Sequence, residues 1–137
     1  MENKKVQVFG YILGELSFII LPFLVMTLIF ANEKNLSKIF EQPEWALTAA
    51  VVFGQSIIRL THFIVKLGKN GTDVYHYNVG ALIALLILLG LVPSLIILAL
   101  IYTSDTVQLW HIIIQMTLFV LSIVIFCFVC KLQVEQE

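Results

Sequence analysis

Four long apolar runs occupy most of this 137-residue chain, at residues 7–30, 45–67, 77–102 and 106–130. Each run exceeds the roughly 20 apolar residues that a helix needs to cross a bilayer core of about 30 Å. The chain is 60% hydrophobic and 12% charged, whereas an ordinary soluble domain is about 45–50% apolar and about 25% charged. The sequence therefore predicts an all-α polytopic membrane protein, with one four-helix transmembrane domain over residues 1–137.

The basic residues predict the orientation of these four helices. The first run extends from Val6 to Ala31, beyond the 7–15 apolar residues of a signal peptide, so we expect it to be retained as a helix. An even number of spans places both termini on one side, and cytoplasmic segments carry an excess of lysine and arginine. The terminal side holds Lys4, Lys5, Lys66, Lys69 and Lys131, and the other side holds Lys34 and Lys38. We therefore expect both termini in the cytoplasm.

Two charged residues, Glu15 and Arg59, lie well inside the apolar runs. An arginine at mid-membrane costs about 2.5–3.5 kcal/mol on insertion scales, so each charge calls for a partner or water. The first two helices are antiparallel, and Glu15 and Arg59 reach similar depth. We expect an intramembrane charge pair, within one subunit or between subunits, because pairing compensates both charges. The pair is either a structural bridge or a titrating, ion-attracting site.

Helix 2 carries a mostly basic stripe over its inner half. Its members are Gln55, Arg59, His62 and Lys66. Their spacings of four, three and four residues place them on one helix face. Snorkelling of the long side chains to the headgroups is one explanation. A partner or a water-accessible surface is the other.

A second polar stripe lies on the outer half of helix 4, at Gln108, His111, Gln115 and Ser122. These side chains would be costly against lipid, so the stripe should face the bundle or a neighbouring subunit. The stripe either forms hydrogen bonds between helices or lines a pore. If both stripes faced one axis, they would outline a polar path across most of the membrane, and four helices are too few to enclose it without further copies.

Local signals place bends, caps and close contacts along the chain. We expect kinks at Pro22 and Pro93, because proline removes a helical hydrogen bond. Asp105 and Gln108 have the spacing of a capping pair at the start of helix 4. Small residues at four-residue spacing favour close helix packing. They are Gly10–Gly14, Ala46–Ala50–Gly54, Gly80–Ala84 and Gly90–Ser94, and a short interfacial helix is expected at 35–40.

No residue set in the sequence predicts an enzyme, a cofactor or a metal site. His62, His76 and His111 lie at different depths, which disfavours bis-histidine haem ligation. Cys127 and Cys130 have CxxC spacing but no second pair to complete a zinc site. Three residues apart on one helix, they also cannot form an unstrained disulfide. A net charge of −1 offers no basic field for direct nucleic-acid binding.

The chain resembles two groups of small four-helix membrane proteins. Glu15 matches in kind the helix 1 glutamate of the small multidrug transporters, but Arg59 would neutralise a carboxylate meant for cationic drugs. The segment from Pro43-Glu44-Trp45-Ala46 to Phe53-Gly54-Gln55 resembles a signature of membrane proteins of phage exclusion and anti-phage defence. The Kiwa membrane subunit and the lambda exclusion membrane protein are examples. This resemblance is one of architecture and implies a bacterial inner-membrane location.

The leading hypothesis is a homo-oligomeric inner-membrane protein that forms a pore or perturbs the bilayer. Its loops are too short for a sensing domain, so we expect a cytoplasmic protein partner to govern it. A secondary transporter that uses Glu15 is one alternative, and a membrane anchor for a soluble partner is another.

Overall fold

In the part of the chain that the computed structural model describes, every element of regular secondary structure is a helix. The chain comprises two compact units, Met1–Gln42 and Pro43–Glu137. The described residues are 10, 13, 14, 17, 19, 21, 23–25, 27–29, 31, 36–68, 73–104 and 106–135.

The first unit is helical at every described position from Gly10 to Ala31. The hydroxyl of Thr27 donates to the carbonyl of Phe23 at 2.7 Å, the usual way in which a hydroxyl is satisfied in an apolar helix. The unit also contains η1, a 3₁₀-helix over Leu36–Glu41, where a short helix is expected from the sequence. The expected kink at Pro22 lies outside the described residues.

Helix α2 covers Glu44–Gly68 and opens the second unit. Its first turn is fixed by the backbone of Pro43, whose carbonyl accepts the Leu47 N–H at 3.1 Å. Glu44 stands in this first turn, where its negative charge complements the helix dipole. The helix extends one residue beyond the predicted run at each end.

The next apolar run forms one continuous helix in three parts: α3 (Asp73–Leu86), η2 (Ile87–Leu91) and α4 (Val92–Thr103). The middle part, η2, is a π-helical turn. It lies just before Pro93, which has no N–H to give to the carbonyl four residues earlier. The expected irregularity at Pro93 therefore takes the form of a π turn. The helix begins at Asp73 rather than 77, because helix formation extends past the apolar residues that set a membrane span.

Helix α5 covers Leu109–Glu135, so it begins three residues later and ends five residues later than the predicted run. The backbone N–H of Gln108 donates to Nδ1 of His111 at 3.2 Å, and the His111 N–H donates to the Gln108 carbonyl at 3.0 Å. A capping contact with the predicted three-residue spacing thus joins Gln108 and His111. Asp105 itself is outside the described residues.

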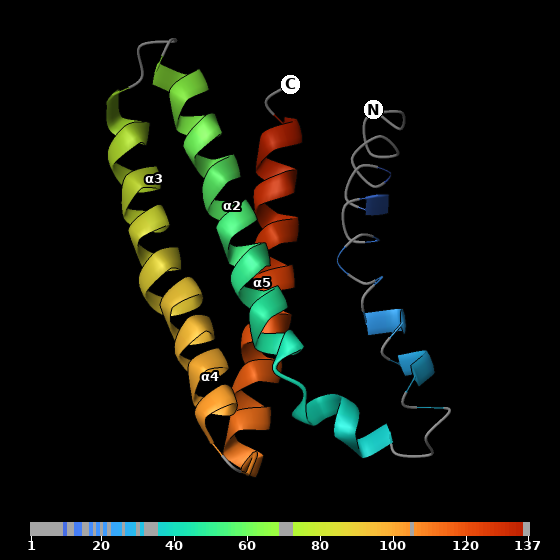
Figure 1. The fold of residues 1–137 in the computed structure, drawn as a ribbon. Coiled ribbons are helices and arrows are strands. Elements are labelled where there is room, and N and C mark those ends of the chain that lie inside the picture. Colours follow the sequence, from blue (N-terminus) through green and yellow to red (C-terminus); the bar gives the residue numbers. More distant parts are fainter. Residues whose placement is uncertain are drawn as a thin grey trace. The chain divides into compact units, whose positions relative to one another are not determined.

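Helix α2 lies at the centre of the second unit and packs against both α5 and the α3–η2–α4 helix. Figure 1 shows that α2 and α5 run in the same direction, with the α3–η2–α4 helix antiparallel to them. The buried side chains of α2 and α5 recur every three or four residues, as in interlocking helices. The recurring set is Ala46, Ala49, Phe53, Ser56 and Leu60 on α2, and His111, Gln115, Leu118, Ser122, Phe126 and Val129 on α5; Ala50, Val52 and Cys130 are buried beside it.

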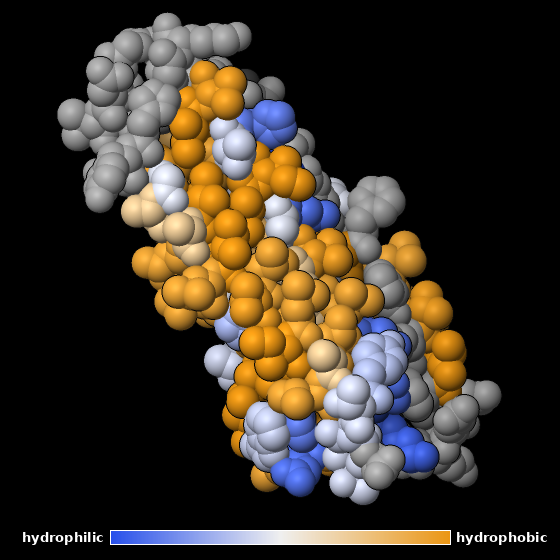
Figure 2. Space-filling model, turned by 60° about the vertical axis from the view of Figure 1, so that its left-hand side comes forward, coloured by the Kyte–Doolittle hydropathy of each residue, from blue (hydrophilic) through white to orange (hydrophobic). Residues whose placement is uncertain are grey.

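Three helical stretches of this unit are long and apolar enough to cross a membrane: Glu44–Val65, Val79–Thr103 and Leu109–Leu132. Figure 2 views the side on which α3 and α4 lie, and hydrophobic side chains dominate that surface. Leucines such as Leu88 and Leu89 are more than half exposed there. A surface of this kind suits a lipid environment rather than water. The expected first span, at 7–30, is described only in part, and its crossing of the membrane stays a prediction.

Candidate functional site

The polar stripe of α2 lies largely on the surface of the second unit. Gln55 and His62 are exposed, and Arg59 between them is half-buried. The side chain of Lys66 lies outside the described part of the chain. All these positions belong to a helix that is apolar enough to cross a membrane. The exposed polar groups therefore need water or a protein neighbour at that depth.

Arg59 borders the interface between α2 and α5. Its guanidinium carbon lies 5.2 Å from the centroid of the Phe126 ring, which is fully buried in α5. A guanidinium over an aromatic face is worth about 0.5–1 kcal/mol when exposed and about 2 kcal/mol when desolvated. This contact holds the Arg59 side chain beside Phe126, at the edge of the exposed α2 face, rather than extended toward the headgroups.

The polar stripe of α5 lies mostly inside the bundle. Gln108 is exposed at the start of the helix, whereas His111 is 2% exposed and Gln115 and Ser122 are fully buried. The Ser122 hydroxyl donates to the Phe119 carbonyl at 2.7 Å. This placement puts His111, Gln115 and Ser122 away from the surface of the second unit. The two polar stripes do not form one common surface in the second unit.

Two buried polar atoms near the beginnings of α2 and α5 lack a hydrogen-bond partner within the described chain. They are Oε2 of Glu44 and Nε2 of His111. Trp45, next to Glu44, meets Phe119 edge to face with ring centroids 4.9 Å apart. The sequence pattern gave no indication that one carboxylate oxygen of Glu44 is buried. The i, i+3 spacing of Gln108 and His111 was the available signal for the reciprocal cap.

Glu15, the other half of the expected charge pair, lies outside the described residues. Its pairing with Arg59 therefore stays a prediction. Cys127 is half-buried and Cys130 is buried, both as thiols. The described residues contain no group of three or more His, Cys, Asp or Glu side chains that could hold a metal ion.

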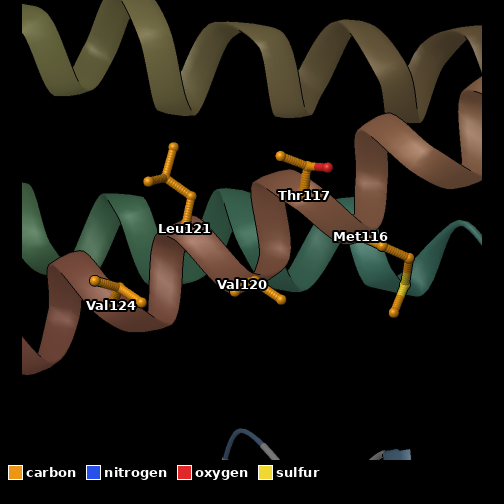
Figure 3. A pocket seen from close by; sticks show the side chains of 5 residues that line it. All are labelled: Met116, Thr117, Val120, Leu121 and Val124. Atoms are coloured by element: carbon orange, nitrogen blue, oxygen red, sulfur yellow. The ribbon is translucent and has the colours of Figure 1, made fainter.

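A shallow apolar groove of about 470 Å³ runs along α5. Figure 3 shows that its five lining side chains all project from this one helix. They are Met116, Thr117, Val120, Leu121 and Val124. None of them belongs to the polar stripes, so the groove offers apolar surface but no catalytic or ion-binding group.

Comparison with known proteins found no matching family model, no matching curated protein and no matching solved structure.

Proposed function

We propose that this chain is a multi-pass membrane protein that assembles into a homo-oligomer and lines a pore, or perturbs the bilayer, with the polar face of α2. The observation that carries the proposal is the exposure of Gln55 and His62, beside half-buried Arg59, on an otherwise apolar helix. Polar groups at this depth are expensive against lipid. A neighbouring copy, or water held between copies, would supply the hydrogen-bond partners that lipid tails lack.

The burial of the α5 stripe also supports α2 as the helix that lines the pore. His111, Gln115 and Ser122 are buried within the second unit, so they are not available to line a path on its surface. A conducting path is therefore assigned to α2 alone. The sequence left open a path lined by both stripes, and the proposal keeps only the α2 stripe as its lining.

The charge of the α2 face sets the expected selectivity. Arg59 and His62 are basic residues of this face. Rings of basic side chains favour anions in pores. Several copies of this face around one axis would therefore conduct anions better than cations.

The test is reconstitution of the purified chain in liposomes, after native mass spectrometry has established its oligomeric state. We expect an oligomer that passes chloride faster than potassium, and a loss of that preference in Arg59→Gln. Leu88→Ala is the matched control, because Leu88 is 67% exposed on a different helix. A monodisperse monomer without flux, alone or with a genomic neighbour's product, contradicts the proposal and favours a membrane anchor.

The location and the partner belong to the same proposal. The resemblance to phage exclusion and defence proteins supports a bacterial inner membrane. The excess of basic residues on the terminal side supports both termini in the cytoplasm, and the short loops support a cytoplasmic partner that governs opening. Plaque counts on cells with and without the gene and its neighbours test the role in defence. Equal plaque numbers on the two kinds of cell, across a broad phage panel, would contradict a role in defence.

A further inference from the structure

The apolar groove on α5 leads, toward the carboxyl end of the helix, to one basic side chain. Thr117, Val124 and Lys131 follow one another at intervals of seven residues, so that successive members lie within about 20° of each other around the helix axis. Thr117 and Val124 line the groove (Figure 3), and Lys131 is exposed. Phe128, which is more than half exposed, stands between Val124 and Lys131. One face of α5 therefore presents an apolar groove and, beyond it, an ammonium group.

The spacing along this face matches the depth of one bilayer leaflet. Lys131 is next to the last residue of the stretch Leu109–Leu132, which is long and apolar enough to cross a membrane. At a rise of about 1.5 Å per residue, Val124 lies about 10 Å deeper than Lys131, and Val120 about 16 Å deeper. Half of the bilayer core is about 15 Å thick. A lipid whose headgroup lies at Lys131 would therefore place an acyl chain along the groove at Val124 and Val120.

The groove has the surface that an acyl chain requires. Thr117 supplies the only hydroxyl among its five lining side chains. This hydroxyl donates to the Ile113 carbonyl at 2.8 Å, so it is satisfied within the helix. Val120 and Val124 are more than half exposed. An acyl chain can therefore lie against these residues without breaking a hydrogen bond.

The charge at the end of the groove favours one class of lipid. From Leu109 to Val134 the chain contains Lys131 and no arginine, aspartate or glutamate. Glu135 follows one turn later, about 6 Å further from the groove along the helix axis. An anionic headgroup brings the opposite charge to Lys131, whereas a second copy docked through the same face would bring another lysine. Charge complementarity therefore favours an anionic lipid over a second copy.

We propose that this face of α5 is a binding site for an anionic phospholipid, with an acyl chain in the groove and the phosphate beside the Lys131 ammonium. Phe128 lies between the two, at the level where the headgroup gives way to the acyl chains. The site belongs to α5, whereas the proposed pore lining belongs to α2, so neither assignment depends on the other.

The experiment reconstitutes the full chain in phosphatidylcholine liposomes that contain a trace of photoactivatable lipid. The probe carries a diazirine on one acyl chain and either a phosphatidylglycerol or a phosphatidylcholine headgroup, and mass spectrometry maps the cross-linked residues. At residues 116–128 we expect about fivefold more cross-linking by the phosphatidylglycerol probe, the preference that one lysine close to an anionic lipid provides. Leu88 and Leu89, which are exposed on η2, are the reference surface and should react equally with both probes.

The matched variants separate the charge of Lys131 from the net charge of the protein. Lys131→Gln should abolish the difference between the two probes, whereas Lys131→Arg should retain it. Lys38→Gln, which removes an equal charge from η1, should also retain it.

Equal cross-linking of the groove by the two probes in the unchanged protein, or a preference that survives Lys131→Gln, overturns the proposal. An absence of cross-links in the groove while Leu88 reacts also overturns it, because the groove is then covered by protein. The preference does not depend on conduction, and a monomer should show it too. Failure of the proposed function therefore leaves this test intact.

Discussion

At the scale of single residues, one missing Cβ sets how closely α2 approaches the neighbouring helix. A Cβ built on Gly90 would lie 2.5 Å from atoms of the Phe53 ring, which is fully buried. The hydroxyl of Ser94 donates to the Gly90 carbonyl at 2.8 Å, so the same turn also satisfies its own polar group. Of the small-residue pairs in the sequence, Gly90–Ser94 is thus one that is used for packing inside the subunit.

Gly90→Ala is expected to destabilise the fold by about 1–3 kcal/mol, the usual cost of overpacking. Gly80→Ala is the matched control, because Gly80 is exposed and a Cβ there meets nothing within 4 Å. It should be neutral or slightly stabilising, since alanine is the better helix former. Thermal unfolding in detergent measures both variants. Equal melting temperatures for the two would contradict the assigned contact.

The predicted pairing of Glu15 with Arg59 is also a residue-scale claim. Arg59 lies beside Phe126 at the edge of the α2 face, where a carboxylate would compensate its charge. We expect Glu15→Gln to lower the yield of folded protein, and the added Arg59→Gln to restore part of it. A double-mutant cycle on expression and melting temperature measures this coupling. Strictly additive losses would count against a direct pair.

At the scale of the elements, the π turn η2 lies next to Pro93 and contains the Gly90 that Phe53 packs against. A π turn accommodates one extra residue in an α-helix. In contrast, removal of a residue from a regular α-helix rotates everything after it by about 100°. The two kinds of segment should therefore respond differently to a deletion.

Removal of Leu88, within η2, should be tolerated because the turn can revert to an α-helix with the flanking residues still in register. Removal of Leu95, which is also exposed but lies in α4, should prevent folding because it rotates Ile97 and Ile101 out of the core. Yield and size-exclusion profile in detergent distinguish the two chains. Similar loss from both deletions would show that η2 does not absorb a residue.

The helices also show which features of the fold the sequence predicts. The apolar runs located α2, α5 and the long helix between them, because length and composition alone define a span. They could not locate the helix ends, since Asp73–His76 and Lys131–Glu135 contain charged and polar residues yet continue their helices. The stripes predicted shared faces, but left open whether the stripe with His111 and Gln115 faces the bundle or a neighbouring subunit, and whether Gln55 and His62 reach the surface. That distinction depends on which faces of α2 and α5 meet, and periodicity within one helix does not contain it.

At the scale of the whole molecule, the proposed topology follows from the lysines in the loops. Lys38 is exposed in η1, and position 70 lies in the connection between α2 and α3. The excess of basic residues at the termini and in that connection predicts that they are cytoplasmic.

Cysteines placed singly at positions 38 and 70, with Cys127 and Cys130 replaced by serine, test this topology in intact cells. An impermeant maleimide should label position 38 and not position 70 until the membrane is opened. Labelling of position 70 in intact cells would reverse the orientation.

The proposed function requires that the exposed polar face of α2 contacts another copy of the chain. His62→Cys, in the same serine background, places a thiol on this face, and Leu88→Cys places one on the apolar surface of η2. Cross-linking with a short bismaleimide in native membranes is the measurement. We predict covalent dimers from position 62 and few or none from position 88. Equal cross-linking at the two positions, together with a monomeric mass for the native protein, would contradict the claim.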